Sequence, residues 1–424
     1  MHRVLSFQMS RNNGESSEYV TKRLCFSFLF SVGFLCLLCG FLLGRFAVER
    51  SLEARVQKTR GELAGNGLLN LEHLQQLACQ ELEKASFNYG RTTNQQTLDE
   101  DVRHITGLFS NLSFVHKVSN HALCICATVR GSREPDRYVI LSVSEDGIAI
   151  ALELARVLDR IHSAYNWRPR RSLIFCVSLV SSDVCPHALP TFVWQKVVAY
   201  AEMHGRFMQV NSHVALSGSD IMRSIAIEAI KTMPSNSNWT YLEHEVFGPR
   251  LSLDIPQVIF SFNDNTPVHS YHNQNFRLRD VTLAQMISQT IWRLSESTVI
   301  QWDPRYFNET INRILESIDT NRFQDAKEKL KRTLRILLTH VKDFNAEIDA
   351  TDNIQMLRVR IWNDLLLELD KTLLCPDKID SHSRTDLATF YKLSHESIDE
   401  SIIIAYLDQM TKCYEDAIQI LQER

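Results

Sequence analysis

The chain has 424 residues, of which 44% are hydrophobic and 23% charged, and this composition excludes a disordered, collagen-like or disulfide-scaffold protein. Its formal net charge of -4 argues against nucleic acid as a partner, because nucleic-acid-binding proteins usually carry a basic excess or stripe. The 14 glycines are half of the usual ~7% share, which disfavours a glycine-rich phosphate-binding loop. At about 150 residues per domain, the length predicts two or three domains.

The first predicted element is a membrane span. Residues Leu24 to Gly44 form a stretch of 21 residues without a charge, which as a helix is long enough for a hydrocarbon layer of about 30 Å. An uncleaved signal anchor fits better than a cleaved signal peptide, whose apolar region has roughly 7–15 residues. Residues 1–23 are then a cytoplasmic tail and the polar residues 45–68 a stalk.

Glycosylation sequons favour one orientation of this span. Basic residues are nearly balanced on its two sides, so their distribution does not decide the topology. Asn111, Asn238 and Asn308 each begin an Asn-x-Ser/Thr triplet, and all three follow the span. We therefore expect a glycosylated, single-pass type II protein of the plasma membrane or the secretory pathway.

The cysteines are divided between the span and the part of the chain that follows it. Cys25, Cys36 and Cys39 lie in the span, which leaves seven of the ten beyond it. An odd number in an oxidising compartment means that at least one stays free or pairs between chains. Cys124 and Cys126 lie two apart in a predicted strand and so share one face, where we interpret them as buried apolar residues rather than redox or metal groups.

Residues 69–303 alternate between strand and helix patterns. Short apolar runs of strand character cover 121–131, 137–147, 171–180, 195–205 and 255–264, and helical spacing covers 69–85, 98–114, 148–165 and 281–297. Such alternation is typical of βαβ units. It predicts an α/β domain with a mostly parallel sheet flanked by helices.

Residues 304–424 lack strand signals and carry three apolar stripes at helical spacing. The first stripe consists of Phe323, Ala326, Leu330, Leu334, Leu337, Val341 and Phe344, the second of Leu357, Ile361, Leu365 and Leu369, and the third of Ile403, Leu407, Met410, Tyr414, Ala417 and Leu421. They predict an all-α bundle. Because the stripes offer more apolar surface than a small unit covers by itself, we expect a homodimer formed through 304–424.

Two segments carry a family resemblance. Trp167-Arg-Pro-Arg-Arg leads into the strand Ser-Leu-Ile-Phe-Cys, and RVRIWNDLLLELDKTLL is followed by YKLSHESIDESI. These segments resemble the peptidase-like and dimerisation domains of transferrin receptors, glutamate carboxypeptidase II and the N-acetylated-alpha-linked acidic dipeptidase-like proteins, closest to the inactive branch of the last group. The resemblance covers nearly the whole chain, but the family's protease-associated insert is missing, so 69–303 is expected to be the peptidase-like domain alone.

The resemblance implies a zinc site whose residues have been replaced. Active members hold two zinc ions with His and carboxylate ligands, and a glutamate activates the bridging water. The replaced positions are Ser144 for a ligand His, Ser181 and Ser182 for an adjacent Glu pair, and His204 for a ligand Asp. The loop with the bridging Asp is deleted, because Asp146-Gly147 runs directly into the next helix.

Few candidate ligands remain, and the sequence therefore predicts a pseudoenzyme without a metal or other cofactor. Asp146 persists, with His269 or His272 as a residual candidate. A serine hydroxyl cannot replace a glutamate base near neutral pH. The residues 216–220 lack the G-x-S-x-G of a nucleophile elbow.

Three functions stay open at this point. The leading hypothesis is a non-enzymatic membrane receptor, scaffold or adaptor with an unknown protein ligand. The first alternative is a zinc exopeptidase with a rebuilt site, whose ligands would be Asp146, Asp183, His204, His269 and His272. The second alternative is a receptor for an iron carrier, which rests on the family resemblance alone.

Overall fold

The computed structural model describes most of the chain between residues 71 and 423 and part of the region before it. The described residues are 28–41, 44–45, 71–87, 98–121, 124–144, 147–180, 185, 188–204, 213–231, 233, 240–242, 255–262, 274–317, 323–351, 355–373 and 400–423. The chain divides into two compact units, Met1–Lys58 and Thr59–Arg424.

In the first unit, residues 28–41 are helical and expose large apolar side chains, with Phe28 at 70% and Phe41 at 68%. The predicted tail, the ends of the predicted span at 24–27 and 42–43, and the stalk beyond residue 45 lie outside the described residues. Among the helices that the structure describes, none combines the length and the apolar character needed to cross a membrane.

The second unit contains an eight-stranded sheet with the order β1-β2-β4-β3-β5-β8-β6-β7. The strands are β1 (Lys117–His121), β2 (Cys124–Val129), β3 (Glu134–Ser144), β4 (Arg171–Ser178), β5 (Val197–His204), β6 (His213–Gly218), β7 (Thr240–Leu242) and β8 (Gln257–Phe262). The four central strands β4, β3, β5 and β8 are parallel, as expected. Strands β2 and β6 run antiparallel to their central neighbours.

The described sheet is mixed: four of its pairings are parallel and three are antiparallel, so antiparallel strands flank the parallel centre that the sequence predicts. β1, β6 and β7 were not predicted, and two of them form antiparallel pairs. Only residues 122 and 123 separate β1 from β2. A connection of two residues can only join antiparallel neighbours, because a parallel pair needs a crossover of a dozen residues or more.

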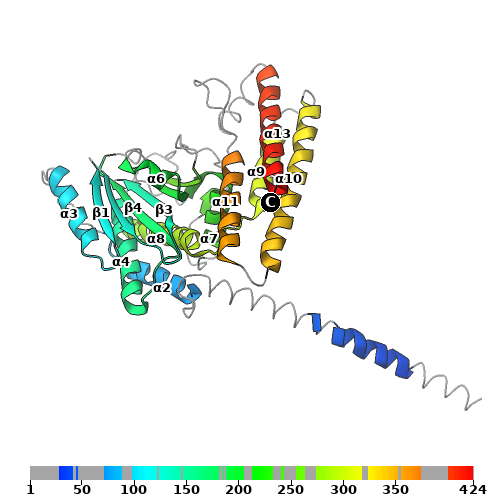
Figure 1. Cartoon of the computed structure of the whole chain (residues 1–424), viewed down its shortest axis with the longest axis horizontal. Helices are drawn as coiled ribbons and strands as arrows, with labels where there is room; N and C mark the ends of the chain where they lie inside the picture. Colours follow the sequence, from blue (N-terminus) through cyan, green and yellow to red (C-terminus); the bar gives the residue numbers. More distant parts are fainter. Residues whose placement is uncertain are drawn as a thin grey trace, which may run out of the picture. The chain divides into compact units, whose positions relative to one another are not determined.

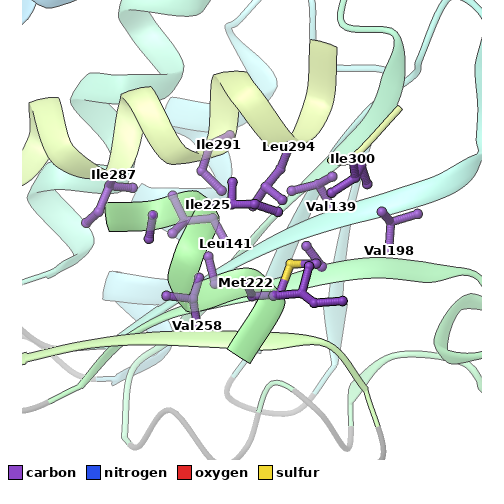
Figure 2. Close-up of a cluster of buried hydrophobic side chains, with 14 of the residues drawn as sticks. Val139, Leu141, Val198, Met222, Ile225, Val258, Ile287, Ile291, Leu294 and Ile300 are labelled. Atoms are coloured by element: carbon purple, nitrogen blue, oxygen red, sulfur yellow. The ribbon is translucent and has the colours of Figure 1, made fainter. Parts of the chain in front are cut away.

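Helices cover the sheet. They are α2 (Leu71–Lys84), α3 (Leu98–Ser110), α4 (Gly147–Tyr165), α6 (Thr191–Trp194), α7 (Asp220–Lys231) and α8 (Gln274–Glu296). α2, α4 and α8 pack together on one face of the sheet (Figure 1), whereas the short α6 packs through Val193 against the other face. Figure 2 shows Ile287, Ile291 and Leu294 of α8 close to the side chains of the central strands, and this contact is the main core.

The backbone conformation of Gly218 accounts for the glycine in the segment 216–220, which lacks the pattern of a nucleophile elbow. Its φ is 119°, and a Cβ at this position would lie 2.1 Å from the carbonyl oxygen of Gln257 on β8. Only glycine fits such a backbone without strain. The segment is thus a strand end that turns into α7.

The C-terminal bundle consists of α9 (Pro304–Ser317), α10 (Gln324–Ala350), α11 (Met356–Leu373) and α13 (Glu400–Gln422) (Figure 1). Seven residues separate α8 from the first helix of the bundle. The bundle contacts the sheet domain through α7, where the Ile221 amide donates to Asp370 at 3.0 Å. The first and third predicted stripes are buried, except that Ala326 is only partly buried. The proposed boundary at residue 304 stays a prediction.

The second stripe was placed wrongly in its first half, whereas Leu369 is buried and Leu365 partly buried. Leu357 is 69% exposed and Ile361 55% exposed, whereas Val359, Trp362 and Leu366 face the core of the bundle. The predicted stripe used a strict spacing of four residues. Because an α-helix has about 3.6 residues per turn, such a line drifts by roughly 40° at each step, and it reaches the buried face only at Leu369.

Candidate functional site at the carboxyl edge of the parallel strands

The carboxyl ends of the four parallel strands lie at one edge of the sheet, where ligands of α/β folds usually bind. Ser144, the last residue of β3, pairs with Ser178, the last residue of β4. Val143 pairs with Met203 of β5, and the next residue of β5 is His204, whose backbone pairs with Ser261 of β8. The structure therefore brings the predicted positions Ser144 and His204 to the same edge.

The other predicted site residues are not described. Asp146, Ser181, Ser182, Asp183, His269 and His272 lie outside the described residues, so their roles stay predictions. The structure does fix the interval between β3 and α4, which consists of residues 145 and 146 alone. This interval, Glu145-Asp146, is shorter than the loop that the resemblance leads us to expect for the family's bridging Asp.

Serines dominate the described part of this edge. Ser178 is fully buried and Ser144 nearly so. Zinc sites in proteins use Cys, His, Asp and Glu ligands, so the hydroxyls of Ser144 and Ser178 do not form such a site. Within the described residues, the group of His, Cys, Asp or Glu side chains close enough to hold a metal ion is Cys124, Cys176 and Cys185.

Cys124 and Cys176 lie on the same face of the sheet: Cys124 pairs with Ser178 in the edge row, and Cys176 lies one row farther in. Strand register aligns Cys126, Cys176, Ser142 and Glu202 across β2, β4, β3 and β5, and cross-strand partners project to one face. All four side chains are buried. Burial raises the pKa of the neighbouring Tyr200 well above its usual value, and the charge of Glu202 raises it further.

The buried thiols differ in acidity. Burial raises the pKa of Cys185, but hydrogen bonds with Cys124 and Cys176 outweigh this effect and lower it to about 6. For Cys176, burial and its hydrogen bonds with Cys124, Cys126 and Cys185 raise the pKa well above the ordinary value. The hydrogen bond with Cys124 is the main cause that raises the pKa of Cys126 to about 12. The prediction that Cys124 and Cys126 are buried is confirmed, but the sequence did not reveal that Cys176 and Cys185 join them.

The Trp-Arg-Pro-Arg-Arg segment has a structural role at the opposite edge. Arg170 Nε donates to Glu134 at 2.6 Å and Arg171 Nε donates to the same carboxylate at 3.2 Å, with all three side chains buried. Arg171 also donates to the carbonyl oxygens of Leu294 and Ser297 at 2.8 and 2.7 Å. These bonds connect β3 and β4 to the end of α8.

Trp167 and Glu296 complete this group, which we call the arginine cluster (Glu134, Trp167, Arg170, Arg171 and Glu296). Trp167 stacks on Trp292 of α8 with ring centroids 4.8 Å apart. The Arg170 amide donates to Glu296 at 3.1 Å. Burial raises the pKa of Glu296 to about 8, although this hydrogen bond and the two arginine charges act in the opposite direction.

Two of the predicted glycosylation sites are described. Asn111 follows α3 directly and is exposed. Asn308 is half-buried inside α9 and accepts a hydrogen bond from Asn312 at 3.1 Å. Asn238 lies outside the described residues. On these grounds Asn111 is the more accessible of the two described acceptors.

Comparison with known proteins gives related sequences. No protein-family profile matches the chain. It is 22% identical over 316 residues to the probable glutamate carboxypeptidase LAMP1 of Arabidopsis thaliana, and 22% identical over 323 residues to the aminopeptidase NAALADL1 of Mus musculus. It is 41% identical over 64 residues to transferrin receptor protein 1 of Gallus gallus. The chain is related to the transferrin receptor and glutamate carboxypeptidase II family. The predicted resemblance is thereby confirmed, while the assignment to an inactive branch stays a prediction.

The chain spans less than half of these relatives. The matches cover 62% of this chain and 45% of the Arabidopsis protein, and 59% of this chain and 43% of the mouse protein. Among solved structures, the fold is similar to that of LapB from Legionella pneumophila, with a TM-score of 0.35, 14% identity and coverage of 57% of this chain and 75% of that chain. An aminopeptidase from Aneurinibacillus gives a TM-score of 0.31 at 13% identity, over 41% of this chain and 48% of that chain.

Proposed function

We propose that this protein is a catalytically inactive relative of the family that works as a membrane-bound receptor, scaffold or adaptor for a protein ligand. One observation carries the proposal. At the carboxyl edge, the ends of β3 and β4 present the paired serines Ser144 and Ser178, and β3 is followed after two residues by α4. A hydroxyl at Ser144 and the short interval after it argue against a two-zinc site.

The missing groups depend on one another chemically. Two metal ions about 3.5–4 Å apart need a bridging carboxylate, and the attacking water needs a base that accepts its proton. Ser181 and Ser182 stand at the positions of the family's Glu pair. Restoring a single residue should therefore not restore activity, because residues of one catalytic unit are strongly non-additive.

An activity assay with metal analysis tests the proposal. The purified full chain should show no chelator-sensitive hydrolysis of acidic dipeptides, and neither should Ser144→His alone. An active glutamate carboxypeptidase, assayed under the same conditions, is the positive control. Chelator-sensitive turnover by the wild type would overturn the proposal and favour an exopeptidase with a rebuilt site.

Membrane attachment belongs to the same proposal. It is supported by the uncharged residues 24–44 and by the exposed apolar side chains between Phe28 and Phe41. We expect the chain to resist extraction from membranes at alkaline pH. Peptide N-glycosidase should increase its gel mobility, and Asn111→Gln should remove part of this shift. A chain that is extracted without detergent and carries no glycan would contradict the topology.

A homodimer through residues 304–424 is also proposed, on a narrower basis than the sequence suggested. Two of the three apolar stripes are buried within the chain, so α11 supplies the remaining surface. Leu357 and Ile361 lie one turn apart on α11 and are both exposed. Leu357→Glu with Ile361→Glu should convert dimer to monomer in light scattering without loss of helix content, whereas a wild-type monomer at micromolar concentration would exclude the dimer.

A further inference from the structure

Four cysteine side chains meet on the face of the sheet that α6 covers. Cys124 and Cys126 lie two apart on β2 and so project to one face, Cys176 is the register partner of Cys126 on β4, and Cys185 follows β4. The Sγ atom of Cys124 lies 2.7 Å from that of Cys185, 3.4 Å from that of Cys176 and 3.9 Å from that of Cys126. Cys126 and Cys176 are 3.1 Å apart. We call these four residues the thiol cluster.

The thiol cluster is enclosed by apolar side chains. Ile140, Ile174, Val193 and Ile255 are buried around it, and each of the four cysteines is at most 2% exposed. All four are free thiols in the structure.

The sulfur atoms of Cys124, Cys176 and Cys185 are grouped closely enough to share one metal ion. A zinc ion bound to sulfur at about 2.3 Å in tetrahedral geometry places its ligand sulfurs roughly 3.8 Å apart. The three sulfurs of Cys124, Cys176 and Cys185 all lie within 4.8 Å of one another. The separations of 2.7 and 3.1 Å are shorter than this ligand spacing, so these sulfur atoms would move apart on binding a metal, and both are longer than the S–S bond of about 2.0 Å in a disulfide. A disulfide would also use only two of the four sulfurs.

We propose that Cys124, Cys176 and Cys185, with Cys126 as the fourth ligand, bind one thiophilic metal ion of the Zn²⁺ class. Soft thiolate ligands select such ions over Mg²⁺ or Ca²⁺. Each thiol that becomes a ligand loses one proton to solvent and forms one metal–sulfur bond, without any change of oxidation state. The ion would tie β2, β4 and the segment at Cys185 together. This site adjoins the carboxyl edge, because Cys124 pairs with Ser178 of the edge row, but its ligands are the sulfur atoms of β2, β4 and Cys185.

Metal titration of the full chain tests the proposal. The protein is purified in detergent under reducing conditions, stripped with a chelator and titrated with Zn²⁺ or with Co²⁺ as a spectroscopic probe. We expect one equivalent per chain and, with Co²⁺, the near-ultraviolet charge-transfer absorption of thiolate ligands. Cys176→Ala should weaken binding by more than tenfold. Cys413→Ala, which alters a cysteine outside the thiol cluster, should keep the stoichiometry.

A second measurement covers the case in which Cys176→Ala does not fold. In the wild type, bound Zn²⁺ should slow alkylation of all four cluster cysteines, mapped by mass spectrometry, but not that of Cys413. Absence of metal binding, or a mass two hydrogens lower with Cys124 linked to Cys185, would overturn the proposal. Zinc binding that survives Cys176→Ala and accompanies peptide hydrolysis would instead contradict the proposed function, so the two failures are distinguishable.

Discussion

Strands β3 and β4 lie side by side through the middle of the sheet, and their two ends differ in chemistry. At the amino ends, Glu134 pairs in register with Arg171, and its carboxylate bonds both Arg170 and Arg171. At the carboxyl ends, Ser144 pairs with Ser178. The family-like segment thus lies where it holds the fold together, and the other end, where we expect the family's ligand position at Ser144, carries hydroxyls. The family resemblance at the amino ends of β3 and β4 therefore supports a shared fold, but it does not decide whether the protein is active.

The largest expected effect comes from breaking the arginine cluster. Glu134→Gln removes the carboxylate that both buried guanidinium groups share, and breaking a buried ion pair typically costs about 3–5 kcal/mol of the free energy of unfolding. Chemical denaturation measures this loss. The control is Glu347→Gln, because the Glu347–Arg358 pair is largely exposed and such pairs contribute about 0–1 kcal/mol. A loss below 1 kcal/mol for Glu134→Gln would show that the cluster is not structural.

An intermediate, pH-dependent effect is expected for Glu296. Its pKa is about 8 in the folded chain against an ordinary value of 4.5. The folded state therefore holds the proton more tightly, and the contribution of Glu296 to stability falls as pH rises from 4.5 to 8. The slope is at most about 1.4 kcal/mol per pH unit. In the metal-free chain, Cys185 acts in the opposite direction from pH 6 to 9, because its pKa is lowered to about 6.

The difference between wild type and Glu296→Gln isolates this group. The variant should gain stability relative to the wild type as pH rises from 5 to 8. Denaturant unfolding at several pH values measures this gain. Glu415→Gln, which changes an exposed carboxyl of α13, is the matched control and should follow the wild type at every pH. Parallel curves for wild type and Glu296→Gln would mean that Glu296 ionises normally in the folded chain.

The smallest effect is expected at the carboxyl edge. Ser144→Ala removes a hydroxyl from a position where we propose no chemistry, so the free energy of unfolding should change by less than about 1 kcal/mol. Zinc content should stay the same, because Ser144 is not in the thiol cluster. If Ser144→Ala lowered the free energy of unfolding by more than about 2 kcal/mol or changed the bound metal, Ser144 would have a structural or metal-binding role, contrary to our proposal.

The sequence was most informative where a segment's own pattern decides its structure. The central strands and the helices α2, α4, α8 and α10 lie where the apolar spacing predicted them. The helix α11 shows the limit of this approach, because Leu357 fits an apolar stripe but faces outward. Which of several apolar lines on a helix is buried depends on the neighbours that the helix meets, and α11 contacts only α13 and α7 among the described element pairs with substantial contact.

Sequence alone determined the class of the fold, because the alternation of strand and helix patterns and the helical end of the chain are local features of the residues themselves. Only the tertiary structure decided which residues meet. Cys126 and Cys176 are 50 residues apart in the chain and face each other because β2 runs antiparallel beside β4 in one particular register. A shift of one residue would turn these side chains to the opposite face. Strand order and register depend on the packing of the whole sheet, and for that reason the thiol cluster and the arginine cluster could not be found in the sequence.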